Sequence, residues 1–273
     1  MARAFHEAYG IKSIAFAKSQ LLPTKYSRFV DVHPYDDFDQ EEGFREHLLT
    51  YGQYMRKTQP DTKLLLIPCG DVYANLLSHN RDQLQDYFLF NTLDPALNHQ
   101  LSMKNSFYEL CEKYQLPHPQ TKVIDKEGVA RGDYKDLPFS FPVAVKPVDS
   151  AAWLTVDFPG RKKAFIIQTP EELDTLIRRS YDAGYQAEMV IQDFIPGDAS
   201  HVRVLNAYVD HHHRVRMMFL GHPLLEDPSP ASVGNYAAII PDYNEEICLK
   251  LKSFLEDIGY EGVANFDMKY DER

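Results

Sequence analysis

The chain has 273 residues, 44% of them apolar and 25% charged, with a formal net charge of −11. This composition is ordinary for a globular protein with a buried core, and the acidic balance argues against a nucleic-acid or anionic-membrane binder, because both need a basic surface. No segment approaches the roughly 20 apolar residues of a membrane span. The N-terminus lacks the apolar core of a signal peptide, and the three cysteines have no metal-ligand spacing, so we expect a cytoplasmic protein.

Helix and strand patterns alternate over the first hundred residues. We expect helices at 2–9, 44–55 and 72–77 and strands at 11–17 and 64–70. This alternation predicts βαβ units around a parallel sheet. Such a domain normally opens with a strand, whereas this sequence opens within a helix.

A second region begins near residue 99. Apolar residues at helical spacing predict a helix over 103–114, and strands are expected at 120–124, 142–146 and 165–168, with a polar, glycine-containing loop over 148–163. Thr169 and Glu172 form a capping box at the start of a further helix, which Gly184 ends.

From residue 188 onward the pattern favours an antiparallel sheet. We expect strands at 188–195, 202–209, 215–221, 236–240 and 263–271, a loop at 223–235 and a helix at 245–258. The turn between the second and third of these strands contains His211, His212 and His213. Three consecutive side chains cannot all face one point, so we favour a solvated turn over a metal site and leave the role of these histidines open.

Four segments carry residues suited to chemistry. Lys146 ends the apolar strand F-P-V-A-V-K-P, where an isolated lysine usually reaches back to the surface. Lys104 lies early in the helix upstream, and V-I-Q-D-F-I-P-G-D (190–198) is a strand that runs into a turn. In A-N-F-D-M-K-Y-D (264–271), the period of two places Asn265, Asp267 and Lys269 on one face of a strand.

In this order and at these spacings, the four segments resemble the ATP-grasp superfamily. The longer strings VIQDFIPGDASHVRVLNAYVD, GHPLLED, GNYAAII and GYEGVANFDMKYDER are similar to the carboxylate–amine ligase branch that includes D-aspartate ligases of Gram-positive peptidoglycan synthesis. The resemblance implies an α/β plus α+β protein with an N-terminal Rossmann-like (pre-ATP-grasp) domain at 1–98 and an ATP-grasp domain at 99–273. The latter would comprise two α+β subdomains, about 99–191 with the phosphate loop and 192–273, the last one incomplete.

The resemblance also implies a site for ATP and Mg²⁺. Lys146 and Lys104 would contact phosphates, since compact ammonium groups neutralise a polyphosphate without one rigid geometry; an ordinary surface lysine remains an alternative for Lys104. The other expected nucleotide contacts are Ser150 in the loop, the hinge residues Gln192, Asp193, Phe194 and Ile195 against adenine, and Asp198 at the ribose. Gln192 stands where many relatives have glutamate, and its neutral amide can still accept from the adenine amino group.

Asp267 would ligate Mg²⁺, which prefers hard oxygen ligands. Members of the superfamily add ligands from a Glu-x-Asn pattern on the next strand, but this sequence stops at Arg273, six residues after Asp267, and Asn265 stands where some relatives have a phosphate-binding arginine. We therefore expect that the sequence is truncated at both ends.

The implied reaction is the ATP-dependent joining of a carboxylate, D-aspartate or a similar amino acid, to the lysine side chain of a peptidoglycan precursor through an acyl phosphate. Arg203 could meet the substrate carboxylate, as a guanidinium does well, or form a cross-strand ion pair; His222 and Asn235 have no specific role. Two alternatives stay open, namely another ATP-grasp amino-acid ligase and a nucleotide-binding fragment without turnover. We expect no nucleic-acid partner and leave a homodimer open.

Overall fold

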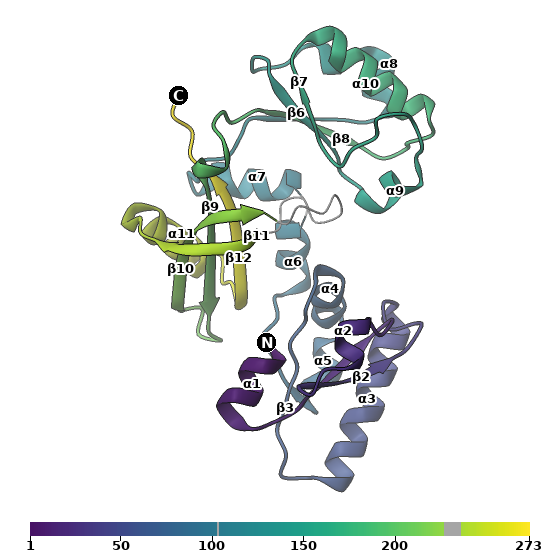
Figure 1. Ribbon diagram of the computed structural model, residues 1–273, viewed down its shortest axis with the longest axis vertical. Coiled ribbons are helices and arrows are strands. Elements are labelled where there is room, and N and C mark those ends of the chain that lie inside the picture. The colour runs from purple at the N-terminus through teal and green to yellow at the C-terminus, as the bar shows by residue number, and fades with distance from the viewer. Residues whose placement is uncertain (103, 227–235) are drawn as a thin grey trace. The chain divides into compact units, whose positions relative to one another are not determined.

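The computed structural model describes residues 1–102, 104–226 and 236–273, which form two compact units. The first contains Met1–Gln100 with two short segments, Asp210–His213 and Tyr260–Gly262, and the second contains the remainder. Figure 1 follows their helices and strands along the chain. Within the described residues, none of the helices is both long and apolar enough to cross a membrane.

Helices and strands alternate in the first unit. The helices are α1 (Ala2–Tyr9), α2 (Leu22–Lys25), α3 (Glu41–Thr58), α4 (Asp71–His79) and α5 (Arg81–Leu84), with α6 (Pro95–Ser102) at its end, and the strands are β1 (Ser13–Ala17), β2 (Val30–Pro34), β3 (Leu64–Leu65) and β4 (Phe88–Leu89). β1 pairs in parallel with β2, and β3 with β4. The predicted parallel pairing is confirmed, but over the described ranges it forms two separate two-stranded sheets. The strand expected at 64–70 is only two residues long and pairs with the equally short β4.

One face of α3 anchors the core of this unit. Phe44 and Leu48, four residues apart and therefore on the same side of the helix, pack with Phe38, Leu77 and Leu84, all of them buried. Burying a leucine or phenylalanine side chain stabilises a fold by about 1.5–3 kcal/mol, so this cluster is a main source of stability in the first unit.

The second unit begins with a four-stranded antiparallel sheet. The strands β5 (Thr121–Ile124), β6 (Val143–Pro147), β7 (Phe165–Ile167) and β8 (Met189–Asp193) lie in the order β5-β8-β6-β7, and the helices are α7 (Lys104–Lys113), α8 (Lys126–Arg131), α9 (Ser150–Thr155) and α10 (Pro170–Asp182). The predicted strands here are confirmed. The capping box is confirmed as well, since the Thr169 side chain accepts a hydrogen bond from the Glu172 amide.

The two faces of this sheet differ in chemistry. Val143 and Val145 of β6 and Ile191 of β8 are fully buried in a core that includes α10 side chains, and in Figure 1 α8 and α10 lie on the same side of the strands. The alternate residues, Lys146 and Gln192, project from the other face by the period of two. The strand pattern therefore places an ammonium group and an amide on one side of the sheet.

The predicted polar loop at 148–163 is wrong in part, because residues 150–155 form the helix α9. Trp153 anchors this helix: its side chain is 4% exposed and its indole N–H donates to the Lys162 carbonyl at 2.8 Å. The Arg161 guanidinium in turn donates to the Trp153 carbonyl at 2.6 Å. The segment is thus fixed to the core of the sheet at its centre.

A second four-stranded sheet completes this unit. Its strands β9 (Val202–Val209), β10 (Val215–Glu226), β11 (Tyr236–Asp242) and β12 (Gly262–Lys269) lie in the order β11-β10-β9-β12. The helix α11 (Glu245–Asp257) packs on one face, where the Phe254 ring lies 6.4 Å from that of Phe266 on β12. The histidine-containing turn between β9 and β10 is confirmed. The expected loop at 223–235 is wrong at its start, because β10 continues to Glu226; its remainder lies outside the described residues.

Candidate functional site

Lys146 carries a half-buried ammonium group. It lies on the face of the β5-β8-β6-β7 sheet that is opposite to the core with α10. The flanking residues Val145 and Pro147 are buried and fix its direction. Burial lowers the pKa of Lys146, because desolvation penalises the charged form. Among the described residues, its ammonium has no hydrogen-bond or ion-pair partner. Such a group is stabilised by an anion, as the predicted phosphate contact requires.

Gln192 is buried, with 7% of its surface exposed. It lies between Thr121 of β5 and Ala144 of β6 in the sheet. Its Nε2 donates to the Tyr108 hydroxyl at 2.6 Å and to Thr121 Oγ1 at 3.1 Å. By the period of two along paired strands, Lys146 and Gln192 share one face of this sheet.

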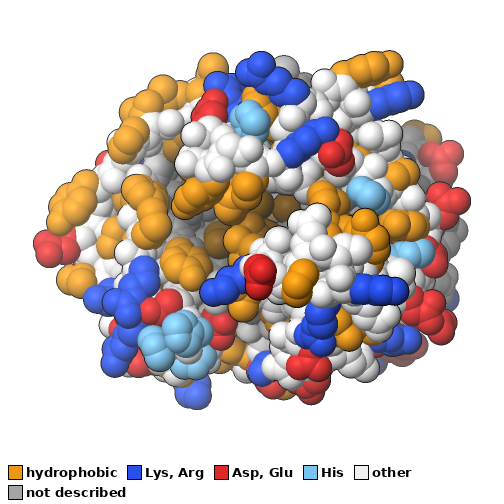
Figure 2. Space-filling model, turned by 90° about the horizontal axis from the view of Figure 1, so that it is seen from below, with side chains coloured by type: hydrophobic (Ala, Val, Ile, Leu, Met, Phe, Trp, Pro, Cys, Tyr) orange, Lys and Arg blue, Asp and Glu red, His pale blue; other side chains and the backbone are white. Residues whose placement is uncertain are grey.

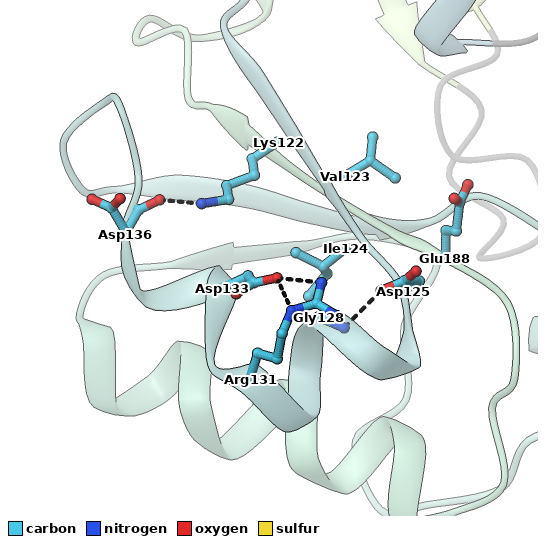
Figure 3. A pocket seen from close by; sticks show the side chains of 9 residues that line it. All are labelled: Lys122, Val123, Ile124, Asp125, Gly128, Arg131, Asp133, Asp136 and Glu188. Atoms are coloured by element: carbon cyan, nitrogen blue, oxygen red, sulfur yellow. Dashed lines mark hydrogen bonds and ion pairs between the residues drawn. The ribbon is translucent and has the colours of Figure 1, made fainter.

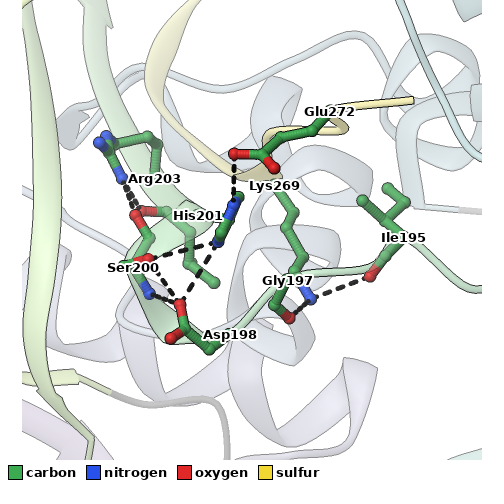
Figure 4. Close-up of polar contacts among 9 residues, drawn as sticks. Ile195, Gly197, Asp198, Ser200, His201, Arg203, Lys269 and Glu272 are labelled. Carbon is green, nitrogen blue, oxygen red and sulfur yellow. Dashed lines mark hydrogen bonds and ion pairs between the residues drawn. The ribbon is translucent and has the colours of Figure 1, made fainter.

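The remaining hinge residues are tied to the C-terminal segment of the chain. The Asp193 carboxylate accepts hydrogen bonds from Arg273 at 2.7 and 3.2 Å. Lys269 Nζ donates to the carbonyl of Ile195 at 2.9 Å and to that of Gly197 at 2.6 Å (Figure 4). It also lies 5.2 Å from the centre of the Phe194 ring. Lys269 thus holds the segment after β8 against β12.

Asp198 caps the short helical turn Ala199–His201 rather than standing free. Its Oδ1 accepts from the Ser200 hydroxyl and amide, and lies 3.3 Å from His201 Nδ1 (Figure 4). The Ser200 hydroxyl is the main cause that lowers the pKa of Asp198 to about 2. The carboxylate is 81% exposed, and Oδ2 takes no part in these contacts. The side chain can accept from a ribose hydroxyl through that second oxygen.

Arg203 forms the ion pair that the sequence left open as one of its two roles. Its Nε donates to Asp242 on β11, and its Nη1 donates to the Ser200 and Val202 carbonyls, each at 2.7 Å. Its guanidinium also lies 5.0 Å from the centre of the Tyr270 ring. These contacts engage Nε and Nη1 of the guanidinium, and they form the ion pair that was one of the two expected roles.

Asp267 lies on the exposed face of β12, opposite to α11. Desolvation by its surroundings nevertheless raises the pKa of its carboxyl. Among the residues that the structure describes, this carboxylate has no hydrogen-bond or ion-pair partner. The neighbouring Asn265 is engaged, donating to Asn206 Oδ1 of β9 at 2.9 Å. Asp267 is therefore a free hard-oxygen ligand, which fits the predicted Mg²⁺ contact.

The structure does not address every residue singled out in the sequence. Lys104 and Ser150 are the first residues of α7 and α9, but their side chains, like the whole of Asn235, lie outside the described part. His222 on β10 has a buried Nδ1 without a hydrogen-bond partner. The described ranges contain no group of three or more His, Cys, Asp and Glu side chains arranged to hold a metal.

Three contact residues were missed by sequence reasoning. Thr121 could have been found, because it opens a strand that must pair with one of the others. Tyr108 carried no local signal, since it lies 84 residues from Gln192. His201 stands next to the glycine turn, but its second partner Glu272 is 71 residues away.

A polar cavity of about 520 Å³ lies beside the edge strand β5 and α8 (Figure 3). Its charged lining residues are Lys122, Asp125, Arg131, Asp133, Asp136 and Glu188. Arg131 donates to Asp133 at 2.6 and 3.0 Å, and Lys122 donates to the Asp136 carbonyl. Its basic groups are thus engaged by its own acceptors, unlike the ammonium of Lys146.

The sequence and the fold both match known ligases. The chain is 53% identical to a D-aspartate ligase of Enterococcus faecium (strain Aus0004), in an alignment that covers 100% of this chain and 65% of that protein. An L-amino acid ligase from Bacillus licheniformis has the same fold, with a TM-score of 0.62 and 16% identity over 99% of this chain and 60% of that one. So has an N5-carboxyaminoimidazole ribonucleotide synthetase in complex with ADP, with a TM-score of 0.63 and 11% identity over 99% of this chain and 63% of that one. No protein-family model matches the chain.

These matches agree with the order of motifs along the chain. The sequence relative covers every residue that the motifs named, and the structural neighbours show the two-sheet fold that carries them. The chain spans just under two thirds of the length of its curated relative. Over its whole length the chain is therefore similar to a D-aspartate ligase, and it shares the fold of an L-amino acid ligase and of a ribonucleotide synthetase.

Proposed function

We propose that this chain binds ATP and Mg²⁺ and supplies the phosphoryl-transfer part of a carboxylate–amine ligase. The observation that carries the proposal is the 53% identity to a D-aspartate ligase over the whole chain. The site residues support it, because the half-buried Lys146 ammonium and the desolvated Asp267 carboxylate both lack a partner among the described residues. The division into domains at 1–98 and 99–273 is part of the same proposal.

Lys146 would stabilise negative charge on the ATP phosphates. An anion beside its ammonium offsets the desolvation that lowers its pKa and so favours the charged form. Such placed charge is the main catalytic device in phosphoryl transfer, where little covalent chemistry falls to the protein. Lys104 would be the second phosphate lysine and Ser150 a hydroxyl donor.

Asp267 would hold Mg²⁺ through a carboxylate oxygen. The ion, when bound, neutralises charge on the phosphates of the nucleotide. The chain's own part is to keep this carboxylate unpaired and fixed on β12, two residues from the lysine that holds the hinge.

The reaction would proceed in two displacements. A carboxylate oxygen attacks the γ-phosphorus of ATP and ADP leaves, giving an acyl phosphate. An amine nitrogen then attacks the acyl carbon, phosphate leaves, and the nitrogen loses a proton to form the amide. Neither step needs a side-chain nucleophile, so positioning and charge suffice.

We further propose D-aspartate as the carboxylate and the lysine side chain of a peptidoglycan precursor as the amine, in a cytoplasmic enzyme. What supports these finer assignments is the name of the sequence relative. The fold alone does not choose among substrates, because it is shared with an L-amino acid ligase. A homodimer stays an open part of this proposal.

The test is magnesium-dependent phosphate release from ATP, with the amide product detected by mass spectrometry. D-aspartate is compared with L-aspartate, each with a lysine-containing peptide as the amine and with Lys146→Met as the control. Release that depends on D-aspartate and is lost in Lys146→Met supports the ligase. Release with another amino acid favours the alternative ligase, and ATP binding without phosphate release favours a nucleotide-binding fragment.

A further inference from the structure

Two hydroxyl groups hold the buried amide of Gln192. Its Nε2 lies 3.1 Å from Thr121 Oγ1 and 2.6 Å from the Tyr108 hydroxyl. The side chain is 7% exposed, and the pairing of Gln192 with Thr121 across β8 and β5 fixes its backbone. Because the nitrogen and oxygen of a primary amide have nearly the same shape, the side chain can fill this site in two orientations that exchange these two atoms.

The Thr121 hydroxyl decides between these orientations. A threonine hydroxyl has one proton, and that of Thr121 is donated to the Pro119 carbonyl at 3.0 Å. Its oxygen can then only accept, so the Gln192 atom that faces it must be a donor. The reverse orientation would place two lone pairs against each other. Thr121 thus requires the nitrogen of the amide on its side.

The Tyr108 hydroxyl is compatible with either orientation of the Gln192 amide and does not select one. Its hydroxyl accepts the second Nε2 proton, and it could equally donate to an amide oxygen in the same place. The Tyr108 ring is stacked on His118, with centroids 5.3 Å apart and an interplanar angle of 18°. Both N–H groups of Gln192 are thereby used, and the described residues give its Oε1 no hydrogen-bond partner.

The free polar atom of Gln192 is consequently an acceptor. It lies on the same face of the sheet as Lys146, the proposed phosphate contact. In the proposed nucleotide site, an acceptor at this position would pair with the amino group at position 6 of adenine and would oppose the carbonyl oxygen that guanine and hypoxanthine carry there. A site that leaves such a group unpaired discriminates strongly between analogues.

We propose that Thr121 is a positioning residue that selects a 6-amino purine over a 6-oxo purine by fixing the Gln192 amide. The inference rests on the proposed nucleotide site and adds a determinant of base selectivity to it. Because Thr121 acts through Gln192, its removal should change the choice of base more than the affinity for phosphate.

The experiment measures dissociation constants for ATP and ITP by titration calorimetry with the whole chain. These nucleotides differ at position 6 of the purine, where ITP carries the oxo group. The wild type is expected to prefer ATP at least tenfold. Thr121→Val and Thr121→Ala, which free the amide to reverse, are expected to reduce that preference at least fivefold, and Thr121→Ser is expected to retain it.

Tyr108→Phe is the matched control. It removes one hydrogen bond to the same amide, but Thr121 still requires the amide nitrogen on its side. Tyr108→Phe should therefore weaken the binding of both nucleotides and keep the ratio of their dissociation constants within about twofold. Urea denaturation verifies that each variant is folded. If either Thr121→Val or Thr121→Ala fails to fold, the other still tests the inference.

The outcomes separate the two claims. A wild type that binds ATP with an unchanged preference in Thr121→Val and Thr121→Ala refutes the inference and leaves the proposed function standing. A wild type that binds ATP and ITP equally also refutes the inference and leaves the proposed function standing. A wild type that binds neither nucleotide refutes the proposed function, and the inference falls with it.

Discussion

Gly197 combines a left-handed backbone with a close side-chain contact, and replacing it with alanine separates these two constraints. Its φ is +95°, which costs a residue with a Cβ roughly 1–2 kcal/mol. A Cβ here would lie 2.6 Å from the Cγ and Nδ1 of His201, and overpacking of this kind costs about 1–3 kcal/mol. We therefore expect Gly197→Ala to lower the free energy of unfolding by roughly 2–5 kcal/mol, the sum of the two costs.

The chain offers a matched control at Gly184, which follows α10. Its φ is +100°, but a Cβ there would meet no atom within 4 Å. Gly184→Ala should therefore show only the backbone cost, roughly 1–2 kcal/mol in urea denaturation followed by circular dichroism. Adding His201→Ala to Gly197→Ala should recover part of the difference. If Gly197→Ala and Gly184→Ala destabilise equally, the contact with His201 does not constrain the hinge and the reasoning is refuted.

Three further predictions concern the charged groups. Lys146→Met should weaken ATP binding at least tenfold in calorimetry yet raise the free energy of unfolding by about 1 kcal/mol, because it removes a desolvated, unpaired ammonium; a destabilised variant would contradict this. Asp267→Asn should raise the Mg²⁺ concentration for half-maximal nucleotide binding about tenfold, and an unchanged magnesium titration would remove Asp267 from the metal site. Hydrogen bonds to Glu272, then Asp198, raise the pKa of His201. The stabilisation by this bridge is therefore complete below the ordinary histidine pKa and is lost as pH rises through the raised value. Hydrogen exchange around His201, corrected for its intrinsic pH dependence, should accelerate over that range in the wild type but not in His201→Gln.

Local patterns were sufficient where one residue decides an element. The capping box predicted the start of α10, and the apolar run before Lys146 predicted the strand β6. Patterning failed at α9, because the polar residues around it masked an apolar turn whose helix depends on the burial of Trp153. A partner that only tertiary packing supplies cannot be read from local sequence.

The candidate site was likewise predictable from the sequence only in part. Lys146, Gln192 and Asp267 were named from motifs, and the structure leaves the ammonium and the carboxylate unpaired within its described ranges. The ion pair of Arg203 was only one of two expectations, because Asp242 lies 39 residues away on a strand separated from β9 by β10. Such pairings depend on strand order, which periodicity does not reveal.

The contacts of Lys269 have a mechanical consequence. By binding the carbonyls of Ile195 and Gly197, this side chain couples the segment 195–197 to β12, which also bears Asp267. At the other end of the hinge, the Asp193 carboxylate is bonded to Arg273, which follows β12 in the chain. The C-terminal segment therefore holds the proposed adenine hinge at both of its ends. The same segment presents the carboxylate that is proposed to hold Mg²⁺.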